Sequence, residues 1–140
     1  MKYRLPPWLG ALAAVAESAR GCGLEAQGAW IAEPPPGVAV LAGYVTLRNG
    51  GDREVILTGA DSPAFGRIEF HALKRRERAW HMQREAELRV PPHGELALVP
   101  GKLHLMLFQP GQEFHPGDQV AINLQCGTGR QRVPFAVVAP

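Results

Sequence analysis

Residues 39–52 have the sequence Ala39-Val40-Leu41-Ala42-Gly43-Tyr44-Val45-Thr46-Leu47-Arg48-Asn49-Gly50-Gly51-Asp52. The first ten residues are mostly apolar, β-branched or aromatic, and such runs favour strands. The last four are turn formers, and Asn-Gly is typical of the tight turn in a β-hairpin. A second apolar run follows at residues 54–60, so we predict a hairpin that turns at Asn49-Gly50.

The same alternation of short apolar runs and turn residues continues along the whole chain. Thirteen prolines and sixteen glycines fall among its 140 residues, and no segment keeps a 3.6-residue apolar period. We therefore predict a single all-β domain, an antiparallel Greek-key sandwich or barrel. The expected strands are residues 24–32, 39–48, 54–60, 67–73, 80–84, 87–90, 95–99, 103–108, 119–125 and 131–138.

The N-terminus has the features of an export signal. Lys2 and Arg4 precede an uncharged apolar stretch at residues 5–16, which is followed by small residues suited to signal peptidase. The stretch is too short to span a bilayer as a helix. We predict a signal peptide at residues 1–21, a mature domain at residues 22–140 and a periplasmic location.

Charge and nucleophile content exclude two classes of function. From residue 22 onward the chain has 12 basic and 12 acidic side chains, so its net charge is about zero and nucleic-acid binding is not expected. Ser18, Ser62 and the few threonines show no pattern of a nucleophile with an adjacent base. We therefore predict that the protein is not an enzyme.

Cys22 and Cys126 are the two cysteines, and two fates of Cys22 remain open. In an oxidising compartment they can form a disulfide between the mature N-terminus and a late strand, which is the interpretation we favour. Alternatively, Ala19-Arg20-Gly21-Cys22 resembles a lipoprotein signal, with Cys22 as the lipid-modified residue. Arg20 fits that signal poorly.

Residues 103–108 contain the most informative side chains. Alternate residues of a strand point to opposite faces, so three leucines share one face while His104 and Met106 share the other. If the leucines face the core, His104 and Met106 lie side by side on the outer face. The alternation also turns His71 away from the apolar face of its strand, and it puts Met82 on the same side as Trp80.

Two histidines and two methionines from three strands would suit one kind of ion. Thioether sulfur is soft and neutral, imidazole is borderline, and together they favour Cu(I). Zinc prefers thiolate, imidazole and carboxylate, whereas calcium and magnesium prefer oxygen. A blue-copper electron-transfer site needs a cysteine ligand, and Cys126 lacks the downstream His and Met of such sites.

The spacing of these residues resembles the signature of the periplasmic PCu(A)C copper chaperones. Ten residues separate His71 from Met82, and twenty-one separate Met82 from His104-Leu105-Met106. The sequence around this H-x10-M-x21-H-x-M pattern is similar too. It includes Gly28-Ala29-Trp30, Pro34-Pro35-Pro36-Gly37, Ser62-Pro63 before Ile68-Glu69-Phe70-His71, Pro100-Gly101 and Pro116-Gly117-Asp118.

The resemblance implies a cupredoxin-like barrel in which His71, Met82, His104 and Met106 bind one Cu(I) per chain. It also implies a carrier that delivers copper to cytochrome c oxidase subunit II, for its dinuclear copper centre, or to another copper assembly protein. We expect a monomer without a transmembrane span. The sequence departs from many relatives at Leu73, where they have Met. Some relatives bind further copper with a His/Met-rich tail, and we expect no such tail site here.

Several residues keep two interpretations. Trp80 either shields the metal or packs in the core. Lys74, Arg75, Arg76 and Arg78 either form a solvated loop or steer docking to an acidic partner. His81, His93 and His115 are expected to be solvated. The alternative function for the whole chain is a metal-free β-sandwich adhesion or assembly module of the cell envelope.

Overall fold

The computed structural model of the protein describes residues 21–139. Within this range the chain forms strands and no helix, which confirms the predicted all-β class. No described segment is therefore a helix able to cross a membrane. The strands are β1 (Leu24–Ala32), β2 (Val40–Asn49), β3 (Val55–Leu57), β4 (Gly59–Asp61), β5 (Phe65–Arg76), β6 (Ala79–Glu85), β7 (Leu88–Val90), β8 (Gly94–Leu98), β9 (Leu103–Pro110), β10 (Gln119–Cys126) and β11 (Gly129–Val138).

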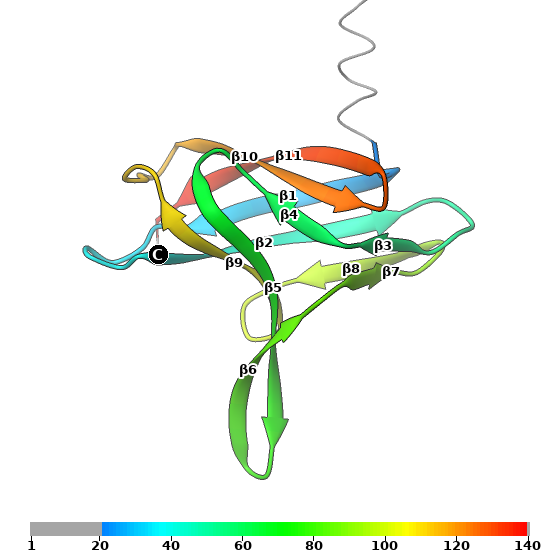
Figure 1. The fold of residues 1–140 in the computed structure, drawn as a ribbon, viewed down its shortest axis with the longest axis horizontal. Coiled ribbons are helices and arrows are strands. Elements are labelled where there is room, and N and C mark those ends of the chain that lie inside the picture. The colour runs from blue at the N-terminus through cyan, green and yellow to red at the C-terminus, as the bar shows by residue number, and fades with distance from the viewer. Residues whose placement is uncertain (1–20, 140) are drawn as a thin grey trace, which may run out of the picture.

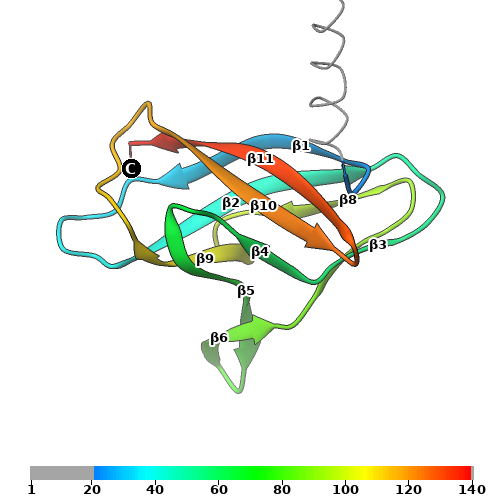
Figure 2. The same ribbon diagram turned by 45° about the horizontal axis from the view of Figure 1, so that its top comes forward.

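Nine strands form one large curled sheet, in the order β4-β10-β11-β1-β2-β8-β9-β5-β6, and β2 also pairs with β9. The remaining strands, β3 and β7, form a small second sheet. Figures 1 and 2 show β10, β11 and β1 on one side of the barrel and β8, β9 and β5 on the other. Because β4 leads directly into β5, the two ends of the curled sheet come close together and close the barrel.

The core lies inside the curled sheet and takes side chains from both sides of it. Ile31 of β1 and Phe135 of β11 are fully buried, as are Leu47 of β2 and the β9 residues Leu105 and Leu107. Alternate residues of β2, β10 and β11 are buried, which is the period expected for strands with one face on a core. β9 follows this period at Leu105 and Leu107, but His104 on its second face is buried as well.

The turn at Asn49-Gly50 does not close a hairpin, so that prediction is wrong. β2 pairs with β1, β8 and β9, whereas β3 pairs with β7. The reason is the buried side chain of Asn49, which is 2% exposed. Its amide donates to the carbonyls of Arg53 and Val90, and its oxygen accepts from the backbone N–H of Gly51. These bonds direct the chain out of the large sheet and into the small one.

The sheet is not purely antiparallel either. β1 runs parallel to β11, with Trp30 opposite Ala136, and β8 has one parallel pair with β9 at Leu98 and Leu103. Short-range turn signals predict antiparallel neighbours, but they carry no information about strands that are distant in sequence. The β1–β11 pairing joins the first and the last strand of the described residues.

β5 and β6 form a long hairpin that projects from the barrel (Figure 1). We predicted strands only at residues 67–73 and 80–84, with the basic residues between them in a loop. Pairing instead continues to Arg76 and Ala79, because Glu77 and Arg78 adopt φ values of 51° and 73° at the turn. Two successive positive φ values match the right-handed twist of a hairpin, and Asn-Gly is the usual sequence there. Glu-Arg gives no such signal.

A disulfide joins Cys22 to Cys126, with 5.9 Å between their Cα atoms, and confirms the favoured pairing. Beside it, the buried amide of Gln131 donates to the carbonyl of Leu24 and accepts from its N–H. The start of β1 is thus held to β10 and β11 at two points. The predicted signal peptide lies outside the described residues except for Gly21, whose backbone is close to that of Arg130.

Candidate metal centre

The two histidines of the predicted site lie opposite each other on neighbouring strands. In the antiparallel β5–β9 pairing, His71 is the partner of His104, and their ring centroids are 5.9 Å apart. Residues directly opposite in a sheet share one face, so both imidazoles are on the face that points away from the leucines of β9. The structure therefore brings together two of the four predicted residues through strand register alone.

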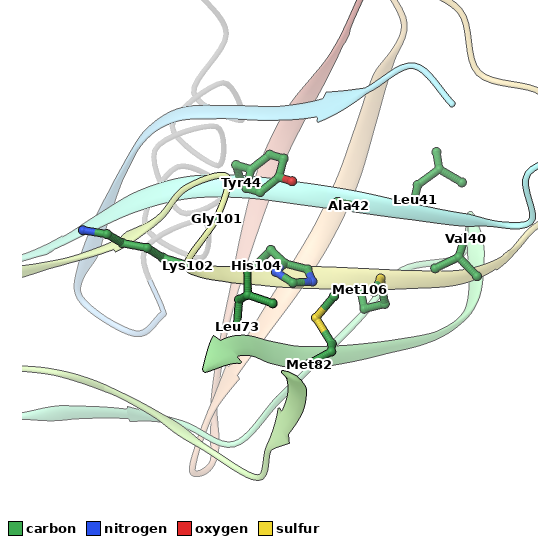
Figure 3. A pocket seen from close by; sticks show the side chains of 10 residues that line it. All are labelled: Val40, Leu41, Ala42, Tyr44, Leu73, Met82, Gly101, Lys102, His104 and Met106. Atoms are coloured by element: carbon green, nitrogen blue, oxygen red, sulfur yellow. The ribbon is translucent and has the colours of Figure 1, made fainter. Parts of the chain in front are cut away.

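Both methionines lie on this same face. Met106 is two residues beyond His104 on β9, and Met82 of β6 is the partner of Leu73, two residues beyond His71. Met82, His104 and Met106 all line one pocket of about 410 Å³. Figure 3 shows the two thioether sulfurs and the imidazole of His104 directed at the same part of this pocket. His71 is not in the pocket wall but borders it through His104.

Exposure differs strongly among these residues. His104 is only 7% exposed, although we expected it on an outer face, because the rings of Tyr44 and His71 on the neighbouring strands flank its imidazole. Met82 is 51% exposed, and Met106 is half-buried. The prediction for the other face is confirmed for Leu105 and Leu107, which are fully buried, whereas Leu103 is half-buried against the core. The site thus has a buried side on the barrel and an open side on the hairpin.

A carboxylate fixes the imidazole of His71. Oε1 of Glu69 is 3.2 Å from Nε2 of His71, and Oε2 of Glu69 is 3.2 Å from the guanidinium of Arg67. The hydrogen bond from His71, followed by the nearby Arg67 and Arg84, lowers the pKa of Glu69, so its carboxylate is ionised and can only accept. Nε2 of His71 therefore donates its proton to Glu69, which leaves Nδ1 as the nitrogen that can offer a lone pair to a metal ion.

Nδ1 of His71 is buried and has no hydrogen-bond partner within the described chain. Buried polar atoms are normally paired, because an unpaired one costs about 1–3 kcal/mol. A lone pair in this position suits a metal ion. The Glu69–His71 pair also has the form in which carboxylates usually orient metal-binding histidines.

His104 is also prepared for metal binding by its surroundings. Burial lowers the pKa of His104 below its usual value near 6.5, the charge of neighbouring His71 lowers it further, and a backbone hydrogen bond with Lys102 opposes both effects. His104 is therefore neutral at pH 7. A neutral imidazole is the form that binds a metal.

The donors that converge are two imidazoles and two thioethers. Among residues 21–139, no group of three or more His, Cys, Asp or Glu side chains is arranged to hold a metal. A site for zinc or calcium would need such a group, whereas the donors present fit a soft monovalent ion. His81, His93 and His115 are exposed, as expected, and do not line the pocket.

Sequence analysis did not identify Tyr44 as a neighbour of these donors. Tyr44 of β2 lines the pocket, with its ring centroid 6.3 Å from that of His104 and 4.7 Å from that of Trp30. The alternation of β2 shows which side Tyr44 faces, but only the β2–β9 pairing places it beside His104. Trp80 does not pack in the core, because it is 61% exposed on the hairpin.

The model of the family described as "Putative lipoprotein LpqE-like" matches residues 24–137. The chain belongs to the LpqE-like family. A relative in Leifsonia xyli subsp. xyli, "Putative lipoprotein Lxx21020", is 27% identical to it over 108 residues. The match covers 76% of this chain and 64% of that protein, so the chain spans less than two thirds of the relative's length.

Solved structures of PCuAC domains have the same fold as this LpqE-like chain. The solution structure of copper(I)-bound DR1885 from Deinococcus radiodurans is 29% identical, with a TM-score of 0.66, and the match covers 95% of this chain and 90% of that one. The copper-bound PCuAC domain of PmoF2 is 24% identical, with a TM-score of 0.72 and coverages of 84% and 94%. The predicted resemblance to PCu(A)C proteins and the cupredoxin-like fold are confirmed.

Proposed function

We propose that this LpqE-like protein binds one Cu(I) ion per chain through His71, Met82, His104 and Met106. The convergence of these four side chains on one face of β5, β6 and β9 carries the proposal. It is supported by the unpaired Nδ1 of His71 and by the neutral state of His104. A structural relative, DR1885, was solved with copper(I) bound.

Such a site suits a carrier. Four neutral donors leave the bound ion with its single positive charge, so no anionic ligand holds it strongly in place. Release then proceeds by ligand exchange, and exposure sets the order in which ligands can leave. Met82 is 51% exposed whereas His104 is 7% exposed, so an incoming ligand from an acceptor reaches the Met82 side first. The protein needs no catalytic group for this, and we propose that it is not an enzyme.

The biological role we propose is export and delivery of copper. Residues 1–21 act as the signal and residues 22–140 as the copper-binding domain, in the periplasm. The acceptor is cytochrome c oxidase subunit II, for its dinuclear copper centre, or another copper assembly protein. The lipoprotein descriptions of the family and of the Leifsonia relative support export. The disulfide and a lipid thioether would both need the sulfur of Cys22, and the structure has the disulfide.

A competitive titration tests the proposal. The reduced protein is titrated with Cu(I) against a chromophoric chelator, and tight one-to-one binding is expected. The double variant Met82→Ala, Met106→Ala should lose it, because both soft donors are gone. A matched control replaces the exposed His93 and His115 by Ala and should bind like the wild type. A wild-type protein that binds no Cu(I) would leave the metal-free envelope module as the better interpretation.

The methionine content allows a direct test of the ligands. After Met1, the chain contains only Met82 and Met106. In the exported protein labelled with selenomethionine, all selenium is therefore in the proposed site. X-ray absorption at the selenium edge should detect copper as a neighbour of selenium only after Cu(I) is added.

A further inference from the structure

The β5–β6 hairpin is the most exposed part of the described chain that carries a proposed ligand. Figures 1 and 2 show it extending away from the barrel. Every residue from Lys74 to Met82 is exposed. Among the described residues nothing buries this tip of the hairpin, so its side chains are available for contact with another molecule.

Positive charge is concentrated on this hairpin. Residues 74–85 contain five basic and two acidic side chains, whereas the rest of the chain from residue 22 contains seven basic and ten acidic ones. A nearly neutral protein thus has a hairpin of charge +3 and a remainder of charge −3. Lys74 pairs with Glu85, but Arg75, Arg76 and Arg78 form no ion pair within residues 21–139.

An exposed aromatic residue lies among these arginines. Trp80 is 61% exposed, and the guanidinium of Arg75 is 5.9 Å from its ring centroid. Tryptophan and arginine are the residues most often found to dominate the energy of protein–protein interfaces. Met82 follows two residues later on the same face of β6, so an interface centred on Trp80 would include a proposed copper ligand.

We propose that the hairpin surface formed by Lys74, Arg75, Arg76, Arg78 and Trp80 docks an acidic surface of the copper-accepting protein. This proposal rests on the proposed function and names the partner's chemistry. An anionic bilayer would also attract the arginines, but it would not explain why a proposed copper ligand lies on the same hairpin. An acidic protein with a cysteine ligand explains both features, because docking would bring its sulfur beside Met82.

Transfer of Cu(I) from this protein to the acceptor needs no oxidant or reductant. A bond forms between the acceptor thiolate and copper while the bond between copper and the Met82 sulfur breaks. Copper stays monovalent, and if the acceptor begins as a thiol its proton goes to solvent. The arginines act before this step, by increasing the rate at which the two proteins meet in the correct orientation.

The test compares two charge-matched triple variants. Arg75→Gln, Arg76→Gln, Arg78→Gln removes the hairpin charges. Arg48→Gln, Arg53→Gln, Arg132→Gln removes three exposed charges elsewhere. The probe is the soluble copper domain of cytochrome c oxidase subunit II, reduced and metal-free. At low ionic strength the hairpin variant should transfer Cu(I) about tenfold more slowly than wild type, and the control variant should not.

Two further measurements separate the outcomes. Cu(I) affinity, measured against the chelator, should be equal in both variants, so failure of the proposed function is detected independently of docking. Binding of the metal-free proteins, followed by NMR, should shift hairpin signals and weaken in Trp80→Ala. Equal slowing in both triple variants, no dependence on ionic strength, or hairpin shifts seen only with phosphatidylglycerol vesicles would overturn the proposal.

Discussion

Glu69 shows how a residue outside the predicted ligand set can control one within it. Its carboxylate accepts a hydrogen bond from Nε2 of His71 through Oε1 and forms ion pairs with Arg67 and Arg84 through Oε2. The tautomer of His71 is then determined by a neighbour two residues away on the same strand. Without that contact, the proton could move to Nδ1, and the lone pair would point to a different place.

Replacing Glu69 should therefore mainly change the tautomer of His71. In metal-free Glu69→Ala, nitrogen chemical shifts of His71 should show a mixture of tautomers, whereas the wild type shows one with the proton on Nε2. Cu(I) affinity should fall about 10- to 100-fold. Glu69→Gln keeps an acceptor oxygen and should restore most of both properties. A wild-type tautomer in the Ala variant would contradict this role.

For single residues, the sequence predicts well which face of a strand a side chain is on, but poorly which residues of other strands lie beside it. Alternation was sufficient to put His104 and Met106 opposite the buried leucines. It could not place His71 beside His104, because that contact depends on the register of two strands about thirty residues apart. For the same reason Tyr44 was missed. The family resemblance supplied the missing register for His71 and Met82, but not for Tyr44.

Among the elements, the turn after β2 is the clearest case of a side chain overriding a local signal. Asn-Gly favours a hairpin, yet the buried Asn49 makes three hydrogen bonds that direct the chain to the small sheet. The strand positions were otherwise predicted closely, since β1 begins and ends where expected and most others differ by no more than two residues at either end. Residues 54–60 were predicted as one strand but form β3 and β4.

Removing the Asn49 side chain should destabilise the fold. Asn49→Ala loses three hydrogen bonds and leaves buried carbonyls unpaired, so the free energy of unfolding should fall by about 2–3 kcal/mol. Urea denaturation measures this, and an unchanged m-value would show that the folded state is still compact. Arg48→Ala, the exposed neighbour, serves as the control and should change stability by less than about 0.5 kcal/mol. A similar effect of both variants would disprove the role of the Asn49 bonds.

For the whole molecule, the disulfide and the β1–β11 pair join residues that are far apart in sequence. Cys22 and Cys126 are separated by 104 positions. The cysteine count and the predicted export signal led us to expect this bridge, whereas nothing in the sequence predicted the parallel pairing beside it. Nothing in a single strand's pattern tells whether its neighbour is parallel or antiparallel.

Loss of the bridge should lower stability without affecting the candidate site. In the chain-entropy model, a loop of this length corresponds to about 4–5 kcal/mol, and removal of native disulfides typically costs about 2–5 kcal/mol. Cys22→Ser, Cys126→Ser should show a loss in this range on denaturation and keep wild-type Cu(I) affinity. The intact mass of the exported protein should rise by two hydrogens on reduction. A lipid adduct on Cys22 would instead contradict the bridge.

The ends of the barrel have a practical consequence. The N-terminal end of β1 lies on one side of the barrel, and the β5–β6 hairpin extends from the other (Figures 1 and 2). A protein immobilised on a sensor chip through its N-terminal segment would therefore present Met82 and Trp80 to the flowing solution. Immobilisation through a residue of the hairpin would block both. The molecule is thus suited to oriented surface attachment, in which every copy offers the same face.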